Sequence, residues 1–227
     1  MTQIHKPRHR PRQFDLIVFD WDGTLFDSTT LIARCIQEAC RDIQVTVPSD
    51  EAAAYVIGLG LHDALQHAVP GLPPERYPEL GLRYRHHYIA KQHELLLFPG
   101  TLEMLQALKE RQHWLAVATG KNRRGLDDAL AHSQLGALFD ATRTADETAS
   151  KPHPLMLQQL MAEFGVRPER TLMIGDTTHD LQLAANAGTA RVAVSYGAHE
   201  PEFFEAHSPL HVAHSTADLH VWLLDNA

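Results

Sequence analysis

The chain has 227 residues, with 44% hydrophobic and 21% charged residues, and this composition is typical of a globular protein rather than a disordered or fibrous one. Its formal net charge is −8, of which Lys6, Arg8, Arg10 and Arg12 contribute +4, so the rest of the chain carries −12. An acidic body disfavours nucleic-acid binding, and the lack of about eighteen consecutive uncharged apolar residues disfavours a membrane span.

Residues 1–13 form a basic tail that we expect to be solvated, and this tail lacks the apolar segment of a secretory signal peptide. We therefore expect a cytoplasmic protein. Cys35 and Cys40 lie in a helical pattern, and a spacing of five residues directs their thiols to different sides of a helix, so we expect reduced thiols that are buried or half-buried. The sixteen histidines show no metal-ligand spacing, and we expect them mainly at the surface.

Short apolar runs alternate with helical patterns along most of the chain. The expected strands are residues 14–19, 114–118, 171–174 and 191–195, and the expected helices between them are residues 101–111, 123–132, 154–164 and 178–187. Continuous apolar runs of this length are typical of parallel strands that are buried on both faces. The alternation predicts an α/β fold with a Rossmann-like parallel sheet.

One interval contains helical patterns only. These patterns cover residues 28–42, 50–57, 61–68 and 74–93, and about seventy residues of helix are too many for one crossover connection. We therefore predict an all-helical subdomain over residues 28–97, inserted into an α/β core that consists of residues 14–27 and 98–227.

Polar residues follow the expected strands where each strand ends. Asp20 and Asp22 follow the first strand, Thr119 ends the second, and Asp176 follows the third, with Asp180 one helical turn later. Ligands of open α/β sheets bind outside the carboxyl ends of the strands, so we expect these side chains, together with a loop lysine at 151, to converge. Carboxylates suit Mg²⁺, attack phosphorus and transfer protons, while a hydroxyl and an ammonium group hold phosphoryl oxygens.

Four segments in this order carry a resemblance to a known family. Residues 20–28 (DWDGTLFDS) resemble the first motif of the haloacid dehalogenase-like hydrolase superfamily. Thr119, the pair Lys151-Pro152 and residues 175–180 (GDTTHD) resemble its second, third and fourth motifs. The resemblance covers residues 14 to about 199, and the helical insert is similar to the cap of the phosphoglycolate phosphatase-like subgroup.

The resemblance implies a role for each acidic residue. Asp20 is expected to be the nucleophile and a metal ligand, and Asp22 the general acid/base that also gives the metal its backbone carbonyl. Asp176 is expected to be the third protein contact to Mg²⁺. Asp180 is expected to support the metal waters or to orient Lys151.

The resemblance also implies that Thr119, Gly120 and Lys151 bind the phosphoryl oxygens. Many relatives carry Asn where this chain has Gly120, which puts one side-chain contact near the leaving group in doubt. The implied activity is Mg²⁺-dependent hydrolysis of a small phosphomonoester through an aspartyl-phosphate. The expected partner is a small anionic phosphorylated substrate, with no nucleic acid and no membrane, and the protein is expected to be a monomer or a homodimer.

Other activities of the same fold must be compared with this one. A dehalogenase lacks the second acid, so Asp22 argues against it. A sugar phosphomutase needs a histidine or lysine in the cap, and His62 and His67 leave that alternative open; a non-catalytic phospho-ligand sensor has no need of Asp22. We expect cap residues to contact the leaving group, with Gly60 and Arg83 as the candidates.

Overall fold

The computed structural model describes residues 12–227. Most of the predicted basic tail, residues 1–11, lies outside the described residues. Arg12 is described, and its guanidinium group lies 2.7 Å from the carboxylate of Asp15, which also forms an ion pair with Arg170. The start of the described chain is thus attached to the core.

A six-stranded parallel sheet forms the centre of the core, in the order β3-β2-β1-β4-β5-β6. Its strands are β1 (Leu16–Phe19), β2 (Trp114–Thr119), β3 (Ala141–Thr144), β4 (Thr171–Gly175), β5 (Ala190–Val194) and β6 (Val212–Ala213). Phe19 at the end of β1 is in register with Val117 of β2 and Ile174 of β4. The carboxyl ends of three strands therefore meet at one edge, and the predicted α/β fold is confirmed.

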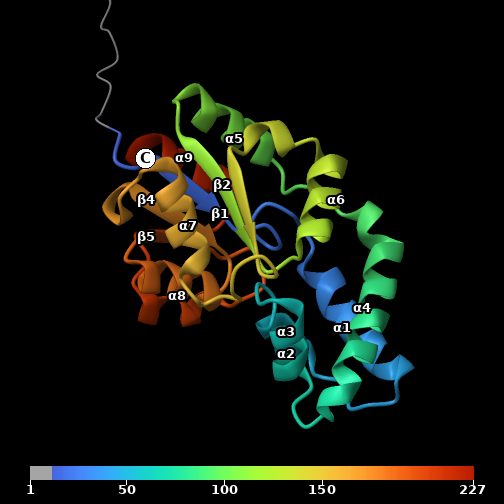
Figure 1. The fold of residues 1–227 in the computed structure, drawn as a ribbon. Coiled ribbons are helices and arrows are strands. Elements are labelled where there is room, and N and C mark those ends of the chain that lie inside the picture. The colour runs from blue at the N-terminus through green and yellow to red at the C-terminus, as the bar shows by residue number, and fades with distance from the viewer. Residues whose placement is uncertain (1–11) are drawn as a thin grey trace, which may run out of the picture.

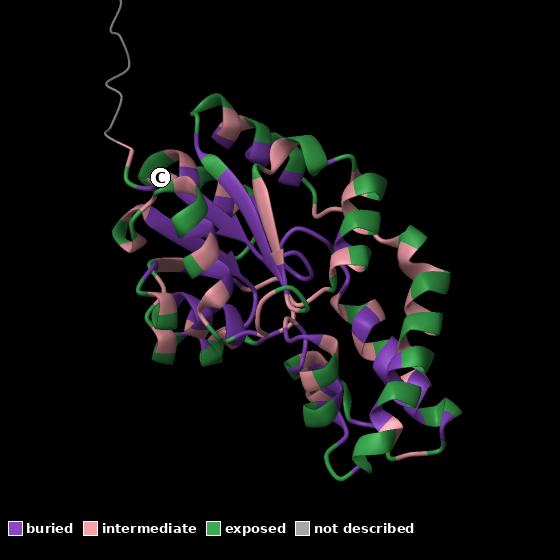
Figure 2. Cartoon of the chain, in the orientation of Figure 1, coloured by how far each residue is buried: buried purple, intermediate pink, exposed green. Residues whose placement is uncertain are grey.

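Helices cover both faces of this sheet (Figure 1). The helices α5 (Thr101–Glu110), α6 (Arg123–Ser133) and α9 (Thr216–Asn226) pack on one face, and α7 (Leu155–Phe164) and α8 (Thr178–Ala187) on the other. Successive strand residues point to opposite faces, so Ile17 and Phe19 contribute to the first cluster and Leu16 and Val18 to the second. The central strands β1 and β4 are buried and the edge strand β3 is mostly half-buried, while the outer helix surfaces are exposed (Figure 2).

Residues 28–97, which we call the cap, contain no strand and have their own apolar cluster (Figure 1). The cap helices are α1 (Thr29–Asp42), α2 (Asp50–Tyr55), α3 (Leu61–Ala68) and α4 (Tyr77–Lys91). Ile36, Leu65 and Leu80 are buried in this cluster. The two connections to the core lie side by side, because Phe26 and Leu97 form an antiparallel bridge. Both ends of the cap therefore join the core at one place.

The structure corrects several expectations of the sequence. Strands β3 and β6 and helix α9 were not predicted, because β3 has mostly half-buried residues and β6 has only two residues. The expected helix 74–93 is divided into a short 3₁₀ turn, α4 and a second 3₁₀ turn. Cys35 and Cys40 are buried free thiols, as expected.

The expectation of surface histidines is wrong for three residues. His113, His179 and His199 are buried, since a backbone carbonyl satisfies a ring nitrogen of each. None of the helices within residues 12–227 has the length and apolar character that are needed to cross a membrane.

Candidate active site

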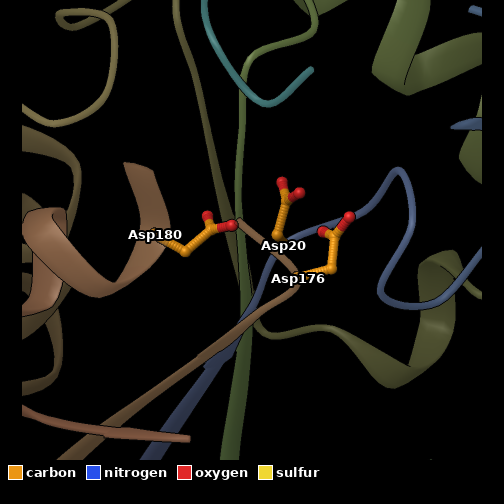
Figure 3. A group of neighbouring side chains, drawn as sticks. All are labelled: Asp20, Asp176 and Asp180. Atoms are coloured by element: carbon orange, nitrogen blue, oxygen red, sulfur yellow. The ribbon is translucent and has the colours of Figure 1, made fainter. Parts of the chain in front are cut away.

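Three carboxylates converge at the edge of the sheet where β1 and β4 end (Figure 3). Asp20 directly follows β1, Asp176 directly follows β4, and Asp180 lies in the first turn of α8. All three are buried, and one oxygen of each lies within 4.8 Å of the others. Among the residues that the structure describes, this is the group of acidic side chains able to hold a metal ion.

Lys151 joins two of these carboxylates. Its Nζ donates to Asp20 Oδ1 and to Asp180 Oδ1, both at 2.6 Å, and the lysine side chain is fully buried. The other oxygen of Asp180 accepts hydrogen bonds from the backbone N–H and the hydroxyl of Thr177, and the backbone N–H of Asp180 donates to Thr177 Oγ1, which completes the capping box of α8. Asp180 is thus fixed by its own helix and in turn orients Lys151.

Asp176 is held by neighbours on both of its oxygens. Thr24 Oγ1 donates to Oδ1 at 2.9 Å, and the backbone N–H of Ala198 donates to Oδ2 at 2.7 Å. Gly23 has a φ of +78°, and a Cβ at this position would lie well under 3.0 Å from Asp176. The glycine after Asp22 is therefore required for the first loop to close against Asp176.

The charges of this cluster do not balance. Three buried carboxylates face a single ammonium group, and Asp20 Oδ2 has no hydrogen-bond partner within the described chain. Burial raises the pKa of Asp20, although the ammonium group of Lys151 opposes the shift, and burial also raises the pKa of Asp176 well above its ordinary value. An excess of buried negative charge and a free carboxylate oxygen fit a hard divalent cation.

Asp22 has a different environment from Asp20. Its Oδ1 accepts from Ser28 Oγ at 2.7 Å, and its Oδ2 lies 3.0 Å from Lys121 Nζ. Burial disfavours a charged Lys121, but the carboxylate of Asp22 and the hydroxyls of Tyr88 and Tyr84 together outweigh this effect and raise the pKa of the ammonium group. Lys121 also donates to the hydroxyl of Tyr88 on α4, at 2.9 Å. Asp22 is thus linked to the cap rather than to the carboxylate cluster.

Thr119 and Gly120 lie where β2 ends beneath the cap. Thr119 is buried, and its hydroxyl accepts from the backbone N–H of Lys121 at 3.2 Å. A Cβ on Gly120 would lie well under 3.0 Å from the backbone carbonyl oxygens of Gly58 and Leu59. The close approach of the cap therefore explains why this chain has glycine where many relatives have asparagine.

A cavity of about 540 Å³ lies between the cap and the core. Its walls include Asp22, Gly60, Tyr88, Lys121 and Arg124. The cavity therefore extends from the proposed general acid toward the cap, and Gly60, which was predicted from the sequence, is part of it.

Arg83, in contrast, is exposed and does not line this cavity, whereas Arg85 does. Residues two positions apart on a helix point in nearly opposite directions, so only one of the two arginines faces the cavity. On the same helix, His87 and Lys91 point to α1, where His87 lies within hydrogen-bond distance of Glu38 and Asp42 and Lys91 lies 3.5 Å from Glu38.

Sequence reasoning missed Thr24, Ser28, Lys121 and Tyr88 as parts of the site. Thr24 and Ser28 lie within the first motif, and Lys121 follows Thr119 by two residues. Their closeness in the sequence to predicted site residues was a signal that they belong to the site. Tyr88 offered none, because its contact with Lys121 depends on how α4 packs against the core.

Comparisons with known proteins identify the family of this chain. Residues 17–194 match the family model described as haloacid dehalogenase-like hydrolase. The chain is 35% identical over 200 residues to a probable phosphatase, IndB, of Dickeya dadantii, with 86% of each chain covered. It is 31% identical over 195 residues to a phosphoglycolate phosphatase of Mannheimia succiniciproducens, with 82% of this chain and 87% of the relative covered. It is 30% identical over 210 residues to the pyrophosphatase PpaX of Bacillus mycoides, with 91% and 95% covered.

Solved structures show the same fold. A predicted phosphoglycolate phosphatase from Haemophilus somnus superposes with a TM-score of 0.81 at 29% identity, over 91% of this chain and 96% of that one. A hydrolase from Pseudomonas syringae has a TM-score of 0.85 at 22% identity, over 93% and 98% of the two chains, and shares the fold.

Proposed function

The chain belongs to the haloacid dehalogenase-like hydrolase family, and we propose that it is a Mg²⁺-dependent phosphatase that hydrolyses a small phosphomonoester through an aspartyl-phosphate on Asp20. The observation that carries the proposal is the different setting of two acids two residues apart. Asp20 lies in the carboxylate cluster, while Asp22 lies outside it and faces the cavity. This difference supports Asp20 as the group that attacks phosphorus and Asp22 as the group that exchanges a proton with the leaving group.

In the first step an oxygen of Asp20 attacks phosphorus, and the bond from phosphorus to the ester oxygen breaks. The leaving oxygen keeps the electron pair and takes a proton from Asp22. In the second step Asp22 removes a proton from water, whose oxygen attacks phosphorus and releases Asp20. The hydrogen bonds from Lys151 to Asp20 and from Ser28 to Asp22 hold both acids in place throughout.

Asp20, Asp176 and the backbone carbonyl of Asp22 would hold the Mg²⁺. When bound, the ion neutralises charge on the phosphoryl oxygens. Lys151 and Thr119 are placed to bind the remaining phosphoryl oxygens, and Gly120 can contribute only its backbone. The unbalanced negative charge of the cluster supports this assignment.

The cavity supports a small anionic ester as the substrate. It lies between the cap and the core and has the size of a small-molecule site, and Arg85, Lys121 and Arg124 contribute positive charge to its walls. The relatives are named for different leaving groups, glycolate in one case and phosphate in another. The residues that choose the leaving group are therefore expected in the cap, with Gly60 among them.

A sugar phosphomutase is the second candidate, because His62 of α3 lines the same cavity from the cap side. A mutase transfers the phosphoryl group to a sugar hydroxyl instead of to water. A product analysis with a sugar phosphate separates the two reactions, since only the phosphatase releases inorganic phosphate in stoichiometric amounts.

The experiment that tests the proposal is a phosphate-release screen with Mg²⁺ and with a chelator. The panel includes phosphoglycolate, pyrophosphate, sugar phosphates and nucleotides, and Asp20→Asn is the control variant. We expect turnover of at least one phosphomonoester that needs both Mg²⁺ and Asp20. Full activity in chelator or in the variant would exclude the mechanism.

A further inference from the structure

The cap contacts the core through an unusual hydrogen-bond acceptor. The carbonyl oxygen of Tyr55, at the end of α2, accepts from His179 Nε2 at 2.8 Å and from His199 Nε2 at 2.9 Å. His179 lies in the first turn of α8, and His199 lies in the loop after β5. Two buried core histidines thus occupy both lone pairs of one cap carbonyl, and neither histidine has a part in the proposed chemistry.

A neighbouring bond fixes the tautomer of one member of this histidine pair (His179 and His199). The backbone N–H of Thr178 donates to His199 Nδ1 at 3.0 Å, so the proton of this ring is on Nε2, where it faces Tyr55. Burial lowers the pKa of His179 to about 4 and also lowers the pKa of His199, which favours the neutral form of both rings. The Tyr55 ring stacks on His199 with a centroid distance of 5.1 Å and an interplanar angle of 5°.

The histidine pair lies next to the segments that carry Asp176 and Asp180. His179 precedes Asp180, and the backbone N–H of His199 donates to the carbonyl of Asp176. The same cap segment reaches the lysine loop, because the backbone N–H of Gly60 donates to Ser150 Oγ at 2.9 Å, next to Lys151. Gly120 of the second motif also lies beneath residues 55–60 of the cap. These cap residues therefore contact the second, third and fourth motifs.

We propose that His179 and His199 are positioning residues that hold residues 55–60 of the cap closed over the cavity. A carbonyl at a helix end has no partner within its helix, so the two donors stabilise the arrangement in which the cap meets the core. Opening the cap breaks both bonds together. Each bond is expected to favour the closed arrangement by roughly twofold to tenfold, the range found for single hydrogen bonds. The effect on turnover rests on the proposed function, whereas the effect on the cap segment does not.

Three variants test the proposal in the full chain. His179→Phe and the double variant His179→Phe/His199→Phe keep the aromatic volume but remove the donors. His179→Gln is the matched control, since the amide nitrogen of Gln can donate from nearly the same place as Nε2. The first measurement is hydrogen exchange of the amides of residues 55–60, with the amides of β1 and β4 as internal references.

We expect exchange in residues 55–60 to be roughly tenfold faster in the double variant, with β1 and β4 unchanged and His179→Gln close to the wild type. Equal exchange in the wild type and the double variant would overturn the proposal. This measurement needs no substrate, so its outcome is independent of whether the protein is a phosphatase.

The second measurement is kcat and KM on the best substrate of the phosphate-release screen. We expect KM to rise about tenfold in the double variant while kcat stays within about twofold, because the catalytic groups are untouched. A fall in kcat with an unchanged KM would mean that the histidines act through Asp180, and the proposal would be wrong. If the wild type hydrolyses no ester at all, the proposed function fails, and the exchange result still decides the role of the histidine pair.

Discussion

The catalytic edge of the sheet and the cap segment above it are held in place by different kinds of contact. At the sheet edge, side chains bind side chains, as in the two ion pairs of Lys151. In the cap, residues 55–60 contact the core through the Tyr55 ring, which stacks on His199, but mostly through backbone atoms, namely the carbonyls of Tyr55, Gly58 and Leu59 and the N–H of Gly60. The chemistry therefore depends on residue identity at a few core positions. The position of residues 55–60 over the core depends on the shape of their backbone and on the core side chains that they contact.

The largest expected effect is on the core side, in Asp20→Asn. An amide cannot attack phosphorus, so we expect kcat/KM to fall by at least about 1,000-fold on every substrate. The fold should survive, because the change removes one of three crowded carboxylates and Lys151 keeps Asp180 as its partner. Steady-state kinetics and the thermal midpoint measure the two effects. If the variant lost activity because it unfolds, the loss would not show that the reaction depends on the carboxylate of Asp20.

The next effect, in Asp22→Asn, should depend on the leaving group. General acid catalysis contributes about 100-fold or more, and an activated aryl phosphate needs less protonation than an alkyl ester. We expect single-turnover transfer to Asp20 to slow much more for the alkyl ester than for the aryl ester. Equal losses for both esters would contradict the role of Asp22 as the acid.

The junction of the two regions is tested by Gly120→Asn, which restores the residue of many relatives. The new Cβ would collide with the carbonyls of Gly58 and Leu59, so the cap segment must move. We expect kcat/KM to fall by roughly tenfold, mainly through KM, with the thermal midpoint within a few degrees of the wild type. Unchanged kinetics would show that the cap of this chain tolerates the family residue and that its close approach has no functional role.

The sequence predicts the sheet edge well because each catalytic residue lies next to a strand end or in a recognisable motif. Asp20 and Asp176 directly follow apolar strands, and parallel strands place their carboxyl ends together. The cap contacts are not predictable in this way. Nothing in the local pattern of Tyr55 or His199 indicates that a carbonyl and a ring nitrogen 144 positions apart will meet. The same limit explains β3, an edge strand without an apolar run that only its pairing with β2 defines.

The core also contains a histidine away from the site, and it predicts a pH dependence of stability. Burial lowers the pKa of His113 to about 4, and its Nδ1 bonds to the carbonyl of Phe14 at 3.0 Å. In the unfolded chain the ring takes up a proton below about pH 6.5, whereas the folded chain does so only near pH 4. The free energy of unfolding should therefore fall as the pH drops from about 6.5 to 4, by roughly 1–2 kcal/mol once solvent screening is allowed for.

Other groups titrate in the same range, so a matched variant is needed. His113→Asn keeps a donor near Nδ1 but does not titrate. The difference in unfolding free energy between the wild type and this variant, measured by urea unfolding at several pH values, should change by that amount between pH 6.5 and 4. A constant difference would mean that His113 is not the origin.

The smallest expected effect is that of Gly81→Ala, which should change the stability of the cap without changing its function. Gly81 lies inside α4, and a Cβ there would meet only Leu65 and Leu61 at 3.7 and 3.9 Å, which is ordinary van der Waals contact. Alanine has a higher helix propensity than glycine, so Gly81→Ala should raise the free energy of unfolding by about 0.5–1 kcal/mol. The residue lies on the side of α4 that packs against α3 and is not among the residues lining the cavity, so kcat and KM should stay within about twofold. If the more stable helix also changed KM, the position of the cap over the site would depend on the internal stability of the cap and not only on the contacts of residues 55–60.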